Sequence, residues 1–326
     1  MSEPLLRVVD LHVSYPVRRG AWRRQAFLRA VAGVDLEVRA GEALGVVGES
    51  GCGKSTLARA ILSLVRPYAG RVLWQGRDVA ELAVAARQSL RRDLQIIFQN
   101  PLASLDPRMP ILEIIAEPLR VHRSELDGRA RASAVRELLQ QMGLAESLAE
   151  RYPHELSGGQ GQRAAIARAM ILRPKLLVCD EAVSALDAAI QAQIIELLRA
   201  VKEDHAVALL FISHNLAVVR ELCDRVLVLY LGRMMEAAPV ALLYERPLHP
   251  YTRGLFEAIP IADPDIQPAR LAHVMPGEPP SALNPPPGCV FHTRCPHVIP
   301  LCRREIPAWE AAGDGRYVAC HRWREL

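Results

Sequence analysis

The sequence lacks an apolar run long enough to cross a membrane, since its longest apolar stretches fall well short of the roughly 18 residues that such a helix needs. It also carries little net charge, +4 over 326 residues, too little to indicate a nucleic-acid-binding protein. Sustained heptads and long internal repeats are absent as well. Half of the residues are apolar, so the chain can build a large core and an appended domain.

Residues 48–55 read Gly-Glu-Ser-Gly-Cys-Gly-Lys-Ser, a pattern typical of a phosphate-binding loop. The apolar run 43–47 before it predicts a buried strand and residues 56–62 predict a helix, which is the context that the motif requires. The alternative is a glycine-rich turn with an incidental lysine. The glycines allow a tight turn whose N–H groups face phosphate oxygens. Lys54 would bridge the β- and γ-phosphates, and Ser55 would hold Mg²⁺. The predicted ATP-binding residues here are Gly48, Glu49, Ser50, Gly51, Cys52, Gly53, Lys54, Ser55 and Thr56.

A second apolar run, residues 176–179, predicts another buried strand and is followed directly by the carboxylates Asp180 and Glu181. Asp180 can reach Mg²⁺ through its water shell, and Glu181 can polarise a water for in-line attack on the γ-phosphorus. A strand followed by a solvated acidic turn is the alternative. With the phosphate-binding loop in the same chain, we predict a hydrolytic site.

Residues 156–160, Leu-Ser-Gly-Gly-Gln, precede a helical pattern over 163–170. Ser157, Gly158, Gly159 and Gln160 lie at a helix start, where a hydroxyl and free N–H groups can receive a phosphate. A Ser-Gly-Gly turn alone is usually only a helix cap. Together with the two preceding motifs, however, the chain resembles the ATP-binding subunits of ABC transporters. That resemblance implies that the turn closes over the ATP of a partner subunit.

Further positions match the same family. The resemblance implies that Gln99 senses Mg²⁺ and the attacking water, that His214 contacts the γ-phosphate, and that residues 184–187, ending in Asp187, cross the dimer. Tyr15 matches the aromatic residue on which adenine stacks, and a half-buried strand tyrosine is its alternative. Taken singly, a glutamine or histidine at a strand end is more often a satisfied polar residue than a catalytic one.

Two positions depart from many relatives. Gly161 replaces a charged or polar residue, which we expect to loosen the helix start by some fraction of about 1 kcal/mol. Ala182 stands where proline often follows the glutamate. Neither removes a group that does chemistry, so we expect a site that is competent for hydrolysis.

Residues 246–252 and 288–296 look like the tail of the peptide and nickel importer branch, and residues 98–108 and 151–155 also suit that branch. The resemblance implies an ATP-hydrolysing subunit that powers import of dipeptides or oligopeptides from the cytoplasmic face of the inner membrane. Its implied partners are a second related ATPase, two permease subunits and an extracytoplasmic solute-binding protein. A nickel or other small-solute importer is the alternative, followed by a soluble ATPase that acts on nucleic acid.

Four of the seven cysteines, Cys289, Cys295, Cys302 and Cys320, lie in the last 38 residues. The chain shows no apolar core of a secretory signal at its start, so we expect disulfides to be disfavoured. The spacing fits neither zinc knuckles nor a ferredoxin run, which leaves the metal open. Resemblance to importer tails favours a [4Fe–4S] cluster that stays out of ATP chemistry. Zinc, with help from His292, His297 or His321, and unligated structural thiols are the alternatives. Cys52, Cys179 and Cys223 are explained by packing.

The motif order predicts an α/β fold. We expect a P-loop ATPase core of the ABC type over residues 1–245, with an antiparallel β-subdomain near its N-terminus and a helical subdomain over about 99–165. Residues 246–326 are predicted to form a loop-rich extension that carries the four-cysteine metal site.

Overall fold

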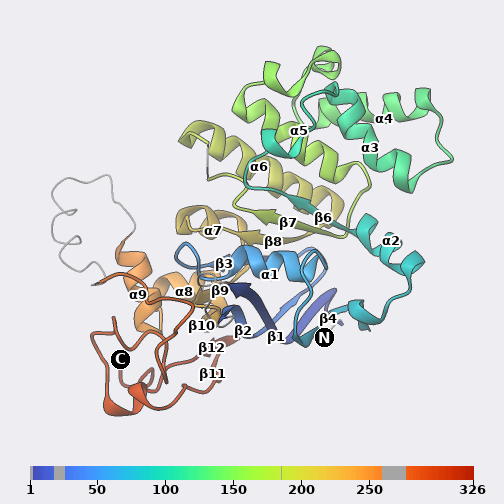
Figure 1. Cartoon of the computed structure of the whole chain (residues 1–326). Coiled ribbons are helices and arrows are strands. Elements are labelled where there is room, and N and C mark those ends of the chain that lie inside the picture. The colour runs from blue at the N-terminus through green and yellow to red at the C-terminus, as the bar shows by residue number, and fades with distance from the viewer. Residues whose placement is uncertain (1–2, 18–25, 185, 259–276) are drawn as a thin grey trace. The chain divides into compact units, whose positions relative to one another are not determined.

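The computed structural model describes residues 3–17, 26–184, 186–258 and 277–326. The strands are β1 (Leu6–Val17), β2 (Ala26–Val38), β3 (Ala43–Val47), β4 (Ala69–Trp74), β5 (Arg77–Asp78), β6 (Leu94–Ile97), β7 (Leu176–Asp180), β8 (Ala208–Ile212), β9 (Arg225–Tyr230), β10 (Arg233–Pro239), β11 (Glu310–Gly313) and β12 (Arg316–Val318). The α-helices are α1 (Lys54–Ile61), α2 (Val84–Asp93), α3 (Ile111–His122), α4 (Gly128–Gln141), α5 (Gly158–Met170), α6 (Ala188–His205), α7 (Leu216–Leu222), α8 (Val240–Glu245) and α9 (Pro250–Glu257). Figure 1 labels these elements.

The chain forms two compact units. The first, here called the helical unit, comprises residues 1–5, 38–43 and 77–213. The second, here called the loop unit because it holds the phosphate-binding loop, comprises residues 6–37, 44–76 and 214–326. Each unit is described by itself.

The helical unit contains the parallel strands β6, β7 and β8, with β7 paired to both of its neighbours. Every residue of β7 and β8 is buried, which is why their sequences are continuous apolar runs rather than alternating ones. Helix α3 packs against α4 and α5. The predicted helical subdomain therefore consists of α3, α4 and the first part of α5.

The loop unit contains two sets of strands. In one, β1 lies between β2 and β4 and pairs with β4 in antiparallel fashion, so the predicted antiparallel β-subdomain is present. In the other, β3 pairs with β9 in parallel, and β10, β12 and β11 follow in antiparallel order.

The last two strands belong to the extension. Pairing of β12 with β10 joins residues 316–318 directly to the sheet that holds β3 (Figure 1). The extension is loop-rich, as predicted, but it also continues the sheet of the loop unit, which the sequence did not reveal. The division of the chain into an ATPase domain, residues 1–245, and an extension, residues 246–326, stays a prediction.

Candidate nucleotide-binding site

The phosphate-binding loop connects β3 to α1, as predicted. Two of its glycines have backbone conformations and surroundings that exclude a side chain. A Cβ on Gly48, at φ 149°, would lie 2.1 Å from the carbonyl oxygen of Leu229, and one on Gly53, at φ 108°, would lie 2.1 Å from that of Ala30. These glycines therefore allow the loop to run directly against the backbone of β9 and β2.

Lys54, the first residue of α1, is buried, with 4% of its surface exposed. Its Nζ donates hydrogen bonds to the carbonyl oxygens of Gly48 at 2.8 Å and Glu49 at 3.1 Å. The loop thus encloses an ammonium group at the N-terminal end of a helix, where positive charge and backbone N–H groups favour an anion. This donor set fits the phosphates of a nucleotide.

The neighbouring predicted residues surround this ammonium group. Cys52 is buried beside Gly48 and Lys54, and burial raises the pKa of its thiol despite the nearby lysine, so packing explains it. Ser50, Gly51, Ser55 and Thr56 complete the loop and the start of α1. The Tyr15 hydroxyl lies 3.5 Å from Oγ1 of Thr56, which puts the predicted adenine platform next to the loop.

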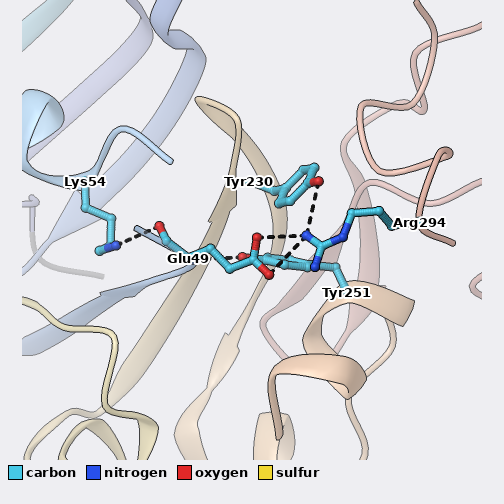
Figure 2. A network of polar contacts seen from close by, with 5 residues as sticks. All are labelled: Glu49, Lys54, Tyr230, Tyr251 and Arg294. Atoms are coloured by element: carbon cyan, nitrogen blue, oxygen red, sulfur yellow. Dashed lines mark hydrogen bonds and ion pairs between the residues drawn. The ribbon is translucent and has the colours of Figure 1, made fainter. Parts of the chain in front are cut away.

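Glu49 connects the loop to two residues near the C-terminal end of the chain (Figure 2). Its N–H donates to the hydroxyl of Tyr251 at 2.9 Å, and its carboxylate accepts two hydrogen bonds from Nη1 of Arg294, at 3.0 and 2.8 Å. Neither partner of Glu49 could be recognised from the sequence. They lie inside the segments 246–252 and 288–296 that marked the importer branch, so their presence was visible but their contact with the loop was not.

His214 lies in the loop unit as well. It lines an open cavity of about 350 Å³ together with Gly48, Glu49, Asn215, Leu216, Leu255 and Ala258. The structure therefore brings the predicted γ-phosphate histidine to the same cavity as the start of the phosphate-binding loop.

The predicted acidic pair and its glutamine lie in the helical unit. Asp180 ends β7 with 5% of its surface exposed. Glu181 follows in a left-handed backbone conformation, φ 51°, which is uncommon for a residue other than glycine and is found at functional sites. The Nε2 of Gln99 donates to Oε2 of Glu181 at 3.0 Å. The structure thus joins the two residues to which we assigned the attacking water.

Ser157 caps α5. Its hydroxyl accepts a hydrogen bond from the N–H of Gln160 at 3.3 Å, and Oε1 of Gln160 accepts one from the N–H of Ser157 at 3.0 Å. This is a reciprocal helix cap, and it leaves Ser157 and Gly158 exposed. The surface that we expect to meet a phosphate is thus presented outward.

Gly159 and Gly161 have packing roles. A Cβ on Gly159 would lie 2.9 Å from Cγ2 of Ile190, and one on Gly161 would lie 2.6 Å from Cδ2 of Leu102. The departure at Gly161 is therefore explained by a close side-chain contact. Asp187 caps α6 by accepting from the N–H of Ile190 at 2.9 Å, and Ala185, from the same predicted dimer-crossing loop, lies outside the described residues.

The four cysteines of the extension lie near one another. The N–H of Cys289 donates to the carbonyl of Cys302 at 2.8 Å. Burial, together with smaller contributions from the Cys302, Cys320 and Cys295 thiols, raises the pKa of Cys289 to about 12. Burial likewise raises the pKa values of Cys295 and Cys320.

The geometry does not confirm a metal site there. Among the described residues, no three His, Cys, Asp or Glu side chains are arranged to hold a metal ion. The four thiols fit a tetrathiolate in number and chemistry, but not in their present positions. Of the histidines in the zinc alternative, His292 bonds the carbonyl of Cys289 and His321 that of Glu305.

Helices long and apolar enough to span a bilayer are absent from the part of the chain that the structure describes.

Comparisons with known proteins cover nearly the whole chain. Residues 31–184 match the family described as ABC transporter, and residues 235–302 match the C-terminal region of oligopeptide/dipeptide transporters. The chain is 49% identical over 311 residues to the oligopeptide transport ATP-binding protein OppF of Salmonella typhimurium, covering 94% of this chain and 93% of that protein. It is 48% identical over 319 residues to the di/tripeptide transport ATP-binding protein DppF of Pseudomonas aeruginosa, with 98% of each chain covered.

A solved structure is similar in fold. It is a dimeric ATP-binding cassette in a post-hydrolysis state with ADP and Pi bound, 28% identical in sequence, with a TM-score of 0.64 over 72% of this chain and 98% of that one. The structural similarity thus leaves out about a quarter of this chain, whereas the similarity to the two transport proteins does not.

Proposed function

Because the chain belongs to the ABC transporter family, as an ATP-binding subunit of its oligopeptide and dipeptide branch, we propose that it hydrolyses ATP to power peptide import at the cytoplasmic face of the cell membrane. The observation that carries the ATPase activity is the buried ammonium group of Lys54 inside the glycine loop. Similarity to peptide transport proteins over 94% and 98% of the chain supports the peptide substrate.

Each polar residue of the site has a role in this proposal. Lys54 and the loop N–H groups bind the β- and γ-phosphates, and Tyr15 stacks on adenine. Ser55, Gln99 and Asp180 hold Mg²⁺, which would neutralise charge on the transferred phosphoryl group. Glu181 accepts a proton from the attacking water, Gln99 orients that carboxylate and the water, and His214 contacts the γ-phosphate.

The exposed cap of α5 provides the second half of the mechanism. Ser157 to Gln160 have no use at the phosphate-binding loop of their own chain, so we assign them to the γ-phosphate on a partner ATPase subunit. Asp187 lies at the start of α6, where it can cross that interface. The partner in this proposal is a related but different chain, and the pair drives two permease subunits fed by an extracytoplasmic solute-binding protein.

The extension carries a separate proposal. Four thiols within electrostatic range of one another support a [4Fe–4S] cluster at Cys289, Cys295, Cys302 and Cys320, with zinc as the alternative metal. Binding would have to shift the thiols toward the ion and release their protons.

Reconstitution tests the transport function. The chain is purified together with its membrane subunits and reconstituted in liposomes. ATP is added on the side of the membrane that carries the ATPase, and a labelled dipeptide, a labelled oligopeptide or Ni²⁺ is supplied as the transport substrate. We expect ATP-dependent movement of a peptide, lost in a complex that carries Lys54→Ala. Movement of Ni²⁺ but of neither peptide would replace the peptide proposal with the metal-importer alternative.

A further inference from the structure

One side chain of the extension reaches the phosphate-binding loop. Nη1 of Arg294 contacts both carboxylate oxygens of Glu49, at 3.0 and 2.8 Å, and lies 3.4 Å from the hydroxyl of Tyr230 (Figure 2). Only 7% of the Arg294 side chain and 23% of the Glu49 side chain are exposed. An ion pair this sheltered from water is stronger than a surface pair and costly to break from one side.

An aromatic cluster fixes the position of Arg294. Tyr230, Tyr251 and Phe291 are each exposed by 1% or less, and their ring centroids lie 4.7 to 5.4 Å apart. Phe291 belongs to the extension, Tyr230 to β9 and Tyr251 to α9. The N–H of Arg294 donates to the carbonyl oxygen of Phe291 at 3.0 Å, so the cluster fixes the backbone from which the guanidinium reaches the loop.

All polar groups of Glu49 are then engaged. Its N–H donates to Tyr251, its carbonyl accepts from Lys54 at 3.1 Å and its carboxylate pairs with Arg294. Glu49 therefore connects the extension to the ammonium group that binds phosphate. A carboxylate at this point of the loop would repel the phosphates of ATP unless its charge were neutralised.

We propose that Arg294 is a positioning residue for ATP binding, which neutralises Glu49 and fixes the conformation of the phosphate-binding loop from the C-terminal extension. The proposal rests on the ATP site proposed above. It changes the expectation that a cluster at the four cysteines stays out of ATP chemistry, because Cys295 is the next residue along the chain. Any change that displaces the segment around Cys295 would then weaken ATP binding.

The test measures the dissociation constant of ATP for the full-length chain, with the thermal unfolding midpoint recorded for each variant. Arg294→Ala should weaken ATP binding about tenfold or more, which is the loss expected when a charged group is left unpaired. Arg294→Lys should restore part of the affinity. Glu49→Gln in the Arg294→Ala background should restore most of it, because the unpaired negative charge is removed. Arg303→Ala, an exposed arginine of the same extension, is the matched control and should bind ATP as the unmodified chain does.

Several outcomes overturn the proposal. If Arg294→Ala lowers the unfolding midpoint but leaves ATP affinity unchanged, the ion pair only anchors the extension. If Glu49→Gln gives no recovery, Arg294 does not act through Glu49. Should Arg294→Ala fail to fold, Arg294→Lys decides the matter: it must lose part of the ATP affinity, and unchanged affinity in that variant would contradict the proposal. Lys54→Ala separates the two proposals, since unchanged ATP binding in that variant would contradict the ATP site itself.

Discussion

Gln99 donates a hydrogen bond from Nε2 to Oε2 of Glu181 across 3.0 Å. The two residues are 82 positions apart, and they follow the neighbouring parallel strands β6 and β7. Since the carboxyl ends of parallel strands lie at one edge of a sheet, the strand order alone brings the amide of Gln99 and the carboxylate of Glu181 together. The carboxylate is oriented before substrate arrives.

Glu181→Gln should cut ATP turnover about 100-fold or more while ATP binding is kept, because the variant loses the proton acceptor but not the phosphate contacts. Turnover in the assembled transporter and the ATP dissociation constant check this. Gln99→Ala should reduce turnover less, since it removes only the orienting hydrogen bond. Near-normal turnover in Glu181→Gln would show that the carboxylate is not the base.

Gly53→Ala should damage the phosphate-binding loop far more than Gly51→Ala. Both positions have a left-handed backbone, but a Cβ on Gly53 would lie 2.1 Å from a backbone oxygen, whereas one on Gly51 would meet nothing within 4 Å. We expect Gly51→Ala to cost on the order of 1 kcal/mol of stability from backbone strain alone. Thermal unfolding and ATP binding of the two variants provide the comparison, and equal losses would show that the clash at Gly53 is not decisive.

Ser157→Arg should prevent ATP-dependent pairing of subunits without weakening ATP binding to the chain itself, because Ser157 is exposed at the start of α5. Sedimentation of the Glu181→Gln chain, mixed with its copurifying partner in ATP and in ADP, measures the pairing. Ser147→Arg, also exposed in the helical unit, serves as the control. Absence of any extra association in ATP would argue against the paired mechanism.

The cysteine proposal is checked by metal analysis of anaerobically purified protein. A [4Fe–4S] cluster should give brown protein with broad absorbance near 400 nm, by the usual thiolate-to-iron charge transfer. Replacement of any one of the four extension cysteines by serine should reduce the metal content, and Cys52→Ser should not. Colourless protein with about one zinc per chain would favour the zinc alternative, and protein without metal would leave structural thiols.

His249 should make stability depend on pH. It is buried, and its Nδ1 accepts a hydrogen bond from the N–H of Tyr251 at the start of α9. Burial, with a smaller contribution from the charge of Arg253, lowers its pKa to about 3. Below about pH 6.5 the unfolded chain therefore binds a proton at His249 that the folded chain does not. The free energy of unfolding consequently decreases as the pH falls from 6.5 toward 3.

His249→Asn keeps a capping oxygen but cannot titrate. The difference in unfolding midpoint between the unmodified chain and this variant should therefore shift in favour of the variant between pH 7.5 and 5. Buried Glu236 works in the opposite direction, because burial raises its pKa. Its hydrogen bond from the backbone N–H of His249 is present in both chains, so its effect should cancel. Parallel pH profiles would contradict the role of His249.

The sequence predicted those parts of the fold that local patterns determine. Strands β3, β7 and β8 are continuous apolar runs because they are buried throughout, and the start of α5 was visible in Ser157 and Gln160. By contrast, β11 and β12 have four and three residues, too few to show a period. Their pairing is a tertiary effect.

The ion pair between Glu49 and Arg294 could not be predicted, since 245 positions separate the two residues and neither has a local pattern that reveals its partner. The same holds for Gly161, whose small size is explained only by Leu102. The metal site at the four cysteines stays a prediction, because the arrangement of the described residues does not by itself form one. Proximity along a chain does not position sulfur atoms at bonding distance.

The pairing of β12 with β10 makes residues 316–318 the cover of a sheet edge. Without them, β10 would present unpaired N–H and C=O groups, a ready template for strands of other molecules. A chain shortened to residues 1–245 would therefore not be a minimal version of this ATPase. It would be an aggregation-prone fragment, because residues 316–318 of the full chain cover that edge and so help to keep the part of the molecule that binds ATP in solution.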